Sequence, residues 1–126
     1  MAETQSIEKI GKEMLRRYLT AAGRKVEDSD VRTFDLIVDG NYAELKAKQN
    51  SWDKFDFISL TKNQKEALGT KLKTIFLVLN VSQPEQVEVV EINADDLLKC
   101  KCQEITHYEW NRGDVQHLRY RPWERR

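Results

Sequence analysis

The sequence has few of the features that mark disulfide-linked, zinc-binding or membrane proteins. Its two cysteines, Cys100 and Cys102, are too close together to staple a fold, and a single Cys-x-Cys pair is a poor zinc signal. No apolar run approaches the roughly 20 residues of a membrane span. The first residues also lack the basic and then apolar layout of a signal peptide. We therefore expect an intracellular, cytoplasmic protein that does not enter a membrane.

Further absences narrow the chemistry. His107 and His117 are the two histidines, and neither metal-ligand spacing nor the logic of a catalytic triad attaches to them. No glycine-rich phosphate loop is present, so an ATPase or a dinucleotide enzyme is not supported. The formal net charge is zero, and bulk electrostatics therefore neither requires nor excludes a nucleic-acid partner.

The charge that is present has a pattern. One basic stretch contains Lys62, Lys65, Lys71 and Lys73 against a single Glu66. The C-terminal RYRPWERR is basic and aromatic, and its Tyr120 and Trp123 offer flat surfaces for bases. Each stretch is suited to following phosphates, and each is equally well explained as a solvated face.

Length, composition and the order of the expected elements predict one α/β domain over residues 1–126. The chain is long enough for one hydrophobic core, and 40% apolar and 33% charged residues are typical of a globular protein. Helical spacing predicts a first helix with Thr4 as its cap and Gly23 at its end. The apolar positions of that helix are Ile7, Ile10, Gly11, Met14, Leu15, Tyr18, Leu19 and Ala22.

The remaining pattern predicts further strands and helices around a mixed sheet. The expected strands are 24–27, 33–38, 42–48, 74–81 and 87–92, and the expected helices are 61–69 and 94–99, the last capped by Asn93. A loop with Trp52, Phe55 and Phe57 precedes the second helix. These aromatic residues are suited to covering a site or stacking on a base, although packing beside a sheet is more common. The segment from Ile105 onward has no clear pattern.

Charged residues interrupt the predicted hairpin DLIVDGNYAELKAK, residues 35–48. Asp39-Gly40 favours a type I′ turn, which pairs Leu36 with Ala43 and places Asp35 opposite Glu44. The apolar face of this hairpin is expected to carry Phe34, Leu36, Ala43, Leu45 and Ala47. Asp35, Glu44 and Lys46 share the other face. Two carboxylates roughly 5 Å apart repel each other unless a cation lies between them.

A divalent cation suits this arrangement, because Mg²⁺ takes carboxylate, water and phosphate oxygens as ligands. A lysine beside the ion can orient or deprotonate an attacking water or steady the charge that develops on phosphorus. The alternative is a turn at Gly40-Asn41, which would place Asp35 opposite Lys46 and make a plain cross-strand ion pair. The residues by themselves leave both interpretations open.

Asp35, eight intervening residues and Glu44-Leu45-Lys46 resemble the PD-(D/E)xK motif of the restriction-endonuclease-like nuclease superfamily. The αβββαβ core of that superfamily matches the order of elements expected over about residues 5–82. The resemblance thus implies a nuclease-like core at about 5–82 and a C-terminal extension at about 83–126. The resemblance implies that Asp35 and Glu44 are metal ligands, with the backbone carbonyl of Leu45 as a further ligand, and that Lys46 is the catalytic lysine. Phe34 stands where the name of the motif has proline, which members of the superfamily often lack.

Two assisting residues follow from the same resemblance. Gln64 begins the second helix, where many members have a Gln or Lys that contacts the attacking water or a phosphate. Thr61 to Gln64 also form a capping box, in which Gln64 ties off the helix start. Some relatives use an acid of the first helix near the metal, and Glu8, at the border of the apolar stripe, fits better than Glu13 on the solvent side. A solvated rim residue is the alternative for Glu8.

We therefore expect a Mg²⁺- or Mn²⁺-dependent nuclease that hydrolyses DNA phosphodiester bonds. Its small size implies that duplex specificity comes from a homodimer or a partner subunit. The second hypothesis is a catalytically silent restriction-endonuclease-like module that binds nucleic acid or a protein partner. The third is an ordinary α/β domain with an accidental motif, since a fold and a short motif do not fix function.

Overall fold

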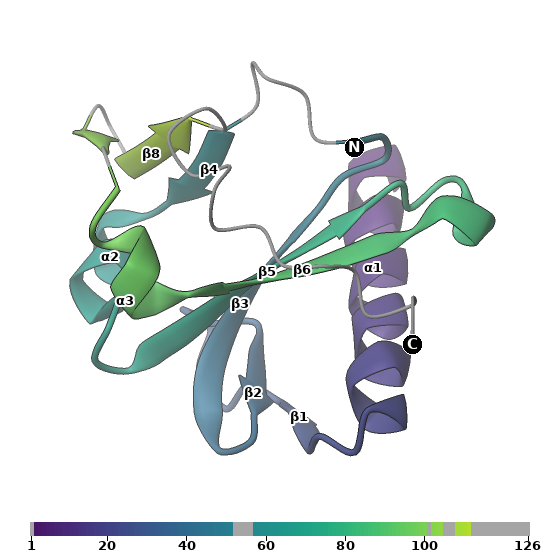
Figure 1. Cartoon of the computed structure of the whole chain (residues 1–126), viewed down its shortest axis with the longest axis horizontal. Helices are drawn as coiled ribbons and strands as arrows, with labels where there is room; N and C mark the ends of the chain where they lie inside the picture. The colour runs from purple at the N-terminus through teal and green to yellow at the C-terminus, as the bar shows by residue number, and fades with distance from the viewer. Residues whose placement is uncertain (1, 52–56, 101, 105–107, 112–126) are drawn as a thin grey trace.

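A mixed five-stranded sheet forms the centre of the computed structural model, which describes residues 2–51, 57–100, 102–104 and 108–111 (Figure 1). The strand order is β1-β2-β3-β5-β6, in which β3 and β5 are parallel and the other neighbours are antiparallel. The strands are β1 (Val26–Asp28), β2 (Leu36–Val38), β3 (Asn41–Ala47), β5 (Leu72–Leu79) and β6 (Glu88–Asn93). The expected α/β class and mixed sheet are confirmed.

The hairpin of β2 and β3 has the register predicted from its turn. Leu36 pairs with Ala43 and Val38 with Asn41. Asp39 and Gly40 have φ values of 51° and 87°, the left-handed pair that a type I′ turn requires. This register excludes the alternative turn at Gly40-Asn41, and with it the plain pairing of Asp35 with Lys46.

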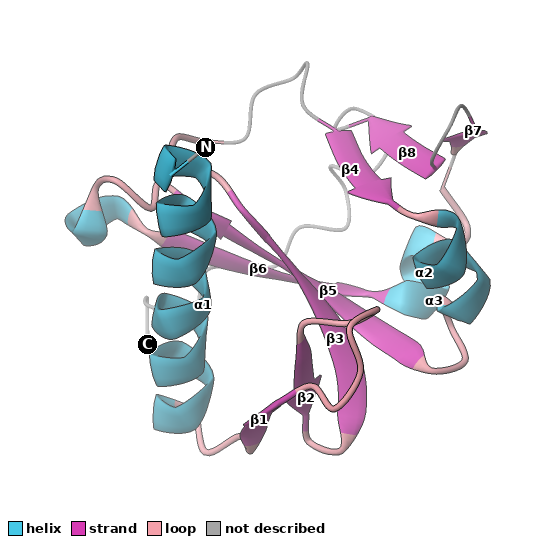
Figure 2. Cartoon of the chain, turned by 180° about the vertical axis from the view of Figure 1, so that it is seen from behind, coloured by secondary structure: helices cyan, strands magenta, loops and turns pink. Residues whose placement is uncertain are grey.

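Helix α1 (Ala2–Ala21) covers one face of the sheet (Figure 2). Leu15 and Leu19 are fully buried against a cluster that includes Leu36, Ala43 and Phe76. Gly23 follows the helix with φ of 82°, as predicted. The prediction that Thr4 caps the helix was wrong, because α1 begins before it.

The apolar stripe of α1 is also narrower than its spacing indicated. Ile10 is 45% exposed, because it lies on the side of the helix that faces away from the sheet. Gly11 occupies the crossing point of α1 and β3, where a Cβ atom would lie 2.7 Å from the Cβ of Ala47. The absence of a side chain therefore permits a close approach of the helix to the strand.

Two short helices and a small second sheet lie on the opposite side of the central sheet from α1 (Figures 1 and 2). The helices are α2 (Lys62–Ala67) and α3 (Ala94–Leu97), and a 3-10 turn, η1 (Pro84–Gln86), precedes β6. The second sheet has the order β4-β8-β7, formed by β4 (Phe57–Leu60), β8 (Tyr108–Asn111) and β7 (Gln103–Glu104). Phe57, predicted in a loop, thus begins a strand. The expected C-terminal extension completes both sheets.

The two faces of the central sheet bury separate apolar clusters. The cluster away from α1 contains Phe34, Ile75, Leu77 and the fully buried Trp110. Phe34 was predicted on the same face as Leu36, which is wrong. The strand β2 starts only at Leu36, so the alternation of faces does not extend back to Phe34.

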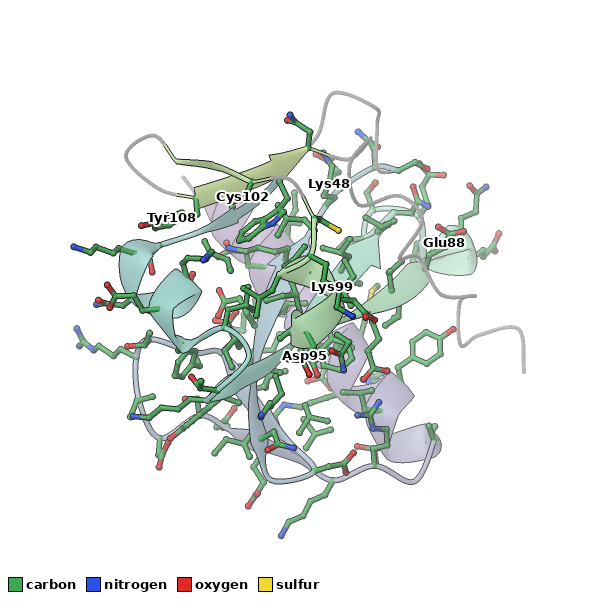
Figure 3. The ribbon with its side chains drawn as sticks, turned by 60° about the vertical axis from the view of Figure 1, so that its left-hand side comes forward. Lys48, Glu88, Asp95, Lys99, Cys102 and Tyr108 are labelled. Atoms are coloured by element: carbon green, nitrogen blue, oxygen red, sulfur yellow. The ribbon has the colours of Figure 1, made fainter. Side chains whose placement is uncertain are left out.

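Cys100 and Cys102 both pack against the cluster away from α1. Figure 3 shows Cys102 near Tyr108 of the small sheet. Among the described residues, no helix is long and apolar enough to cross a membrane.

Candidate functional site

Asp35 directly precedes β2, which begins at Leu36. On this side, β3 has no paired strand beyond Ala43 among the described residues. Asp35 Oδ2 accepts a hydrogen bond of 2.9 Å from the backbone N–H of Leu45. The last residue pair of the hairpin is Leu36 with Ala43, so this side-chain bond takes the place of a backbone hydrogen bond that the next pair would form. Asp35 is thereby held beside Glu44 and Lys46, as the turn predicted.

Three contacts fix the segment that carries Asp35. The hydroxyl of Tyr42 donates a hydrogen bond of 2.6 Å to Asp30, and the Tyr42 ring lies 4.7 Å from the ring of Phe34. Gln64 Nε2 donates a bond of 2.8 Å to the backbone carbonyl of Thr33. The residues that precede the acid are therefore anchored to β3 and α2.

Glu44 is an almost fully buried acid with an incomplete set of partners. Only 6% of its surface is exposed, and its Oε1 atom forms no hydrogen bond. Burial, and after it the nearby Asp35 carboxylate, raise the pKa of Glu44 to about 8, although Lys46 and the Gln64 amide act in the opposite direction. Such an oxygen is costly unless a proton or a cation satisfies it.

Lys46 gives Glu44 only partial compensation. Its Nζ lies 3.6 Å from Glu44 Oε2, which is too long for a strong charge-assisted hydrogen bond. About a third of the Lys46 side chain, 34%, remains exposed. The ammonium group therefore lies between the buried acid and solvent, where it can also reach a bound anion.

The backbone of Leu45 presents an oxygen to the same place. In an extended strand, the N–H and C=O of one residue point to the same side. The N–H of Leu45 points to Asp35, so its carbonyl also faces the side of β3 that no strand covers beyond Ala43. Leu45 lines the cleft together with Asp35, Glu44 and Lys46, as its predicted role as a ligand requires.

These residues form one wall of a cleft of about 380 Å³. The other wall comes from α1 and consists of Glu8, Lys9 and Lys12. The close approach at Gly11 brings this part of the helix to the edge of β3. Of the two acids weighed on the first helix, Glu8 thus lies at the cleft, whereas Glu13 is absent from its lining and pairs with Arg17 at 3.2 Å.

Gln64 is held by its helix, and its amide also acts on Glu44, whose pKa it lowers. Its Oε1 accepts a bond from the Thr61 N–H, and its own N–H donates to the Thr61 hydroxyl, which completes the predicted capping box. Its Nε2 is committed to the Thr33 carbonyl, and the residue does not line the cleft. A direct contact with water or phosphate stays a prediction, while its positioning of the Asp35 segment is observed.

The donor atoms fit a hard divalent cation. Asp35 and Glu44 supply carboxylate oxygens, one of them buried without a partner, and the Leu45 carbonyl faces the same side. Mg²⁺ is commonly held by one or two carboxylates with waters and substrate oxygens filling its other positions. The part of the chain that the structure describes contains no cluster of three His, Cys, Asp or Glu side chains suited to a metal. Glu8 thus lines the cleft without completing a three-acid site.

Sequence reasoning missed Lys9 and Lys12, the two cations on the α1 wall. Their signal was available, because residues 8 and 12 share a helix face once Glu8 is placed at the site. Several residues weighed in the sequence lie outside the described residues: Trp52, Phe55, His107, His117, Tyr120 and Trp123.

Comparisons with known proteins add no family to this geometry. No protein-family model matches the chain, and neither the curated proteins nor the solved structures contain a significant match.

Proposed function

We propose that the protein is a Mg²⁺-dependent DNA nuclease of the PD-(D/E)xK type, with a restriction-endonuclease-like core. The order α1, β1, β2, β3, α2, β5 agrees with that core, with β4 as an added strand of the second sheet. The observation that carries the proposal is the buried, unpartnered Oε1 of Glu44 beside Asp35 and Lys46 in an open cleft. A purely structural acid at this depth is expected to have all its oxygens satisfied.

Each side chain has a distinct role in this proposal. Asp35 and Glu44, with the Leu45 carbonyl, hold the cation, which when bound polarises the phosphodiester and lowers the pKa of a water molecule. Lys46 donates hydrogen bonds to the attacking water or to the phosphate oxygens on which negative charge develops. Glu8 accepts a hydrogen bond from water at the opposite wall. Gln64 positions Asp35 through Thr33.

The order of binding follows from the charges. In the metal-free protein, Glu44 holds a proton below about pH 8. Glu44 would have to release this proton to hold a cation, and the cation would then neutralise the second carboxylate charge that Lys46 by itself does not balance. The Lys46 ammonium can then turn to the substrate phosphate, which its exposure permits.

The test is cleavage of linear, circular, single-stranded and branched DNA with Mg²⁺ or Mn²⁺. Lys46→Ala and Glu44→Gln should each lower the cleavage rate by at least about 10²-fold, the scale of a lost charge-stabilising or general-base group. Lys99→Ala and Glu66→Gln are matched controls, because both residues are exposed and lie outside the cleft lining. Both controls should cut at the wild-type rate.

The result can contradict the proposal in two ways. Absence of cleavage by the folded wild type under all metal conditions, or full activity of both cleft variants, would rule out this hairpin as a nuclease site. Binding of nucleic acid without cleavage would favour the silent module instead. A homodimer or partner subunit, proposed here for duplex substrates, would appear as cleavage that depends on protein concentration or on an added fraction.

A further inference from the structure

The α1 wall of the cleft carries two lysines and one acid, Glu8, whereas the β3 wall carries two acids, Asp35 and Glu44, and one lysine. Lys9 is exposed and forms no ion pair with any described residue. Lys12 Nζ lies 3.5 Å from Asp28, but this carboxylate is also hydrogen-bonded to Arg16. Asp28 therefore keeps a cationic partner if Lys12 moves to an anion.

The acids around these lysines are accounted for. Glu13 pairs with Arg17, and Asp28 with Arg16. Glu8 lies in the cleft itself. Lys9, Lys12 and Arg16 of α1 are thus three cations against two acids, Glu8 of the helix and Asp28 of β1, which leaves this side of the helix net positive.

The spacing of these cations matches a nucleic-acid strand. Residues 9, 12 and 16 follow one helix face, and seven residues of α-helix span about 10 Å. One DNA strand carries a phosphate about every 3.4 Å along the helix axis. The row of Lys9, Lys12 and Arg16 is therefore long enough to contact about three phosphates. It begins at the cleft and ends where Arg16 contacts Asp28.

We propose that Lys9 and Lys12 bind two successive phosphates on one side of the scissile bond, so that the substrate strand leaves the cleft along α1. This inference rests on the proposed function for the identity of the ligand. The strand is positioned by its backbone and without base contacts, which makes the contribution independent of sequence.

The predicted basic stretch on α2 and β5 is the rival surface. Two of its four lysines have other contacts: Lys65 Nζ lies 5.3 Å above the ring of Tyr108, and Lys73 donates a hydrogen bond to the Gly69 carbonyl. None of these lysines lines the cleft. The observations therefore favour the lysines of α1 as the residues that bind the phosphates.

The test measures binding of labelled single-stranded and duplex DNA by fluorescence anisotropy, with Ca²⁺ in place of Mg²⁺, over a range of salt concentrations. The slope of log K against log salt should fall by about 1.8 for duplex and about 1.4 for single strands in Lys9→Ala/Lys12→Ala, the values for two lost phosphate contacts. Lys25→Ala/Lys99→Ala is the matched control. Both of its lysines are exposed and outside the cleft lining, and removing them changes the net charge equally.

A third variant, Lys62→Ala/Lys65→Ala, tests the rival surface with the same helical spacing. Only the Lys9/Lys12 variant should change the slope. An unchanged slope in that variant, an equal decrease in the matched control, or a decrease confined to the α2 variant would overturn the inference. Circular dichroism spectra of all variants show whether each one is folded.

Failure of this inference is separable from failure of the proposed nuclease. If the wild type cleaves DNA and the Lys9/Lys12 variant keeps both its KM and its slope of log K against log salt, the nuclease function is supported and phosphate binding by Lys9 and Lys12 is wrong. If the wild type binds DNA through Lys9 and Lys12 but never cleaves it, phosphate binding by these lysines is supported and the nuclease function is wrong. Absence of DNA binding by the wild type overturns both.

Discussion

The two ends of the β2–β3 hairpin each carry a charged cluster, and the two clusters differ in how well they are neutralised. At the turn, Arg24 donates to Asp39 at 2.8 Å and to both oxygens of Glu91 at 3.0 and 3.1 Å. At the open end, Asp35 and Glu44 have Lys46 as their cation, at 3.6 Å from Glu44. In the first cluster Arg24 neutralises and hydrogen-bonds both acids. In the second, Glu44 Oε1 has no hydrogen-bond partner among the described residues.

The pKa values follow this difference. The hydrogen bond from Arg24 lowers the pKa of Asp39. Burial alone would lower the pKa of Arg24, but its bonds to Glu91 and Asp39 raise it. Burial and the Asp35 charge instead raise the pKa of Glu44 to about 8. A cluster that stabilises its own ionised state is structural, and one that opposes it is suited to an external cation.

The largest expected effect is on the pH dependence of stability without metal. A rise in the pKa of Glu44 from 4.5 to about 8 corresponds to on the order of 5 kcal/mol. The folded protein binds this proton more tightly than the unfolded chain does. The corresponding part of the free energy of unfolding is therefore fully present below pH 4.5 and is lost as the pH rises to about 8. Urea denaturation in EDTA should give a falling free energy of unfolding across this window.

Glu44→Gln should remove most of that dependence, because the amide cannot ionise. Glu91→Gln is the control at the other cluster and should leave the slope between pH 4.5 and 8 intact. Equal slopes in the wild type and Glu44→Gln would mean that Glu44 is already ionised in the folded protein, and the contrast between the two clusters would disappear.

The second effect is stabilisation by Mg²⁺. A metal that binds only the folded state at about 100 times its Kd raises the free energy of unfolding by about 2.7 kcal/mol. Since the cation must displace the proton of Glu44, its apparent affinity should fall as the pH decreases below about 8. Calorimetry in two buffers of different ionisation enthalpy measures the proton released. No Mg²⁺ effect in the wild type, or the same effect in Glu44→Gln, would contradict a cation site here.

The third effect separates structure from chemistry. Arg24→Met should cost about 2 kcal/mol of stability, because it leaves the exposed Asp39 and the partly buried Glu91 without their shared partner. Below its unfolding temperature, the variant should cleave DNA at the wild-type rate per folded molecule. Denaturation curves and single-turnover rates measure the two quantities. A large loss of cleavage with an intact fold would show that the turn cluster also serves the reaction.

The sequence predicted the hairpin and the convergence of its acids because both depend on local rules. Asp39-Gly40 determines the turn, and the turn determines which residues pair. The cap of α3 is equally local: Asn93 Oδ1 accepts a bond of 2.8 Å from the Asp95 N–H. The residues that carry these features are neighbours in sequence, so their geometry follows from short-range chemistry.

The features that the sequence did not predict depend on distant contacts. Strand β4 is formed by pairing with β8, as Ile58 with Trp110, and neither short segment has a distinct pattern of its own. The α1 wall of the cleft depends on the crossing of helix and strand at Gly11 and Ala47. Lys9 and Lys12 become cleft residues only through that crossing.

The smallest expected effect concerns the support of the open-end cluster. Gln64→Ala removes the reciprocal capping bond to Thr61 and the bond to the Thr33 carbonyl. The stability loss should be about 1 kcal/mol, the usual value of a helix cap. If Gln64 also positions Asp35, the variant should weaken Mg²⁺ binding beyond what this loss explains. Thr61→Ala is the matched control, because it removes the capping hydroxyl and leaves the Gln64 contact with Thr33 in place. Equal Mg²⁺ affinities in the two variants would mean that Gln64 acts only as a cap, and unequal ones that the segment before Asp35 is held in place for the metal.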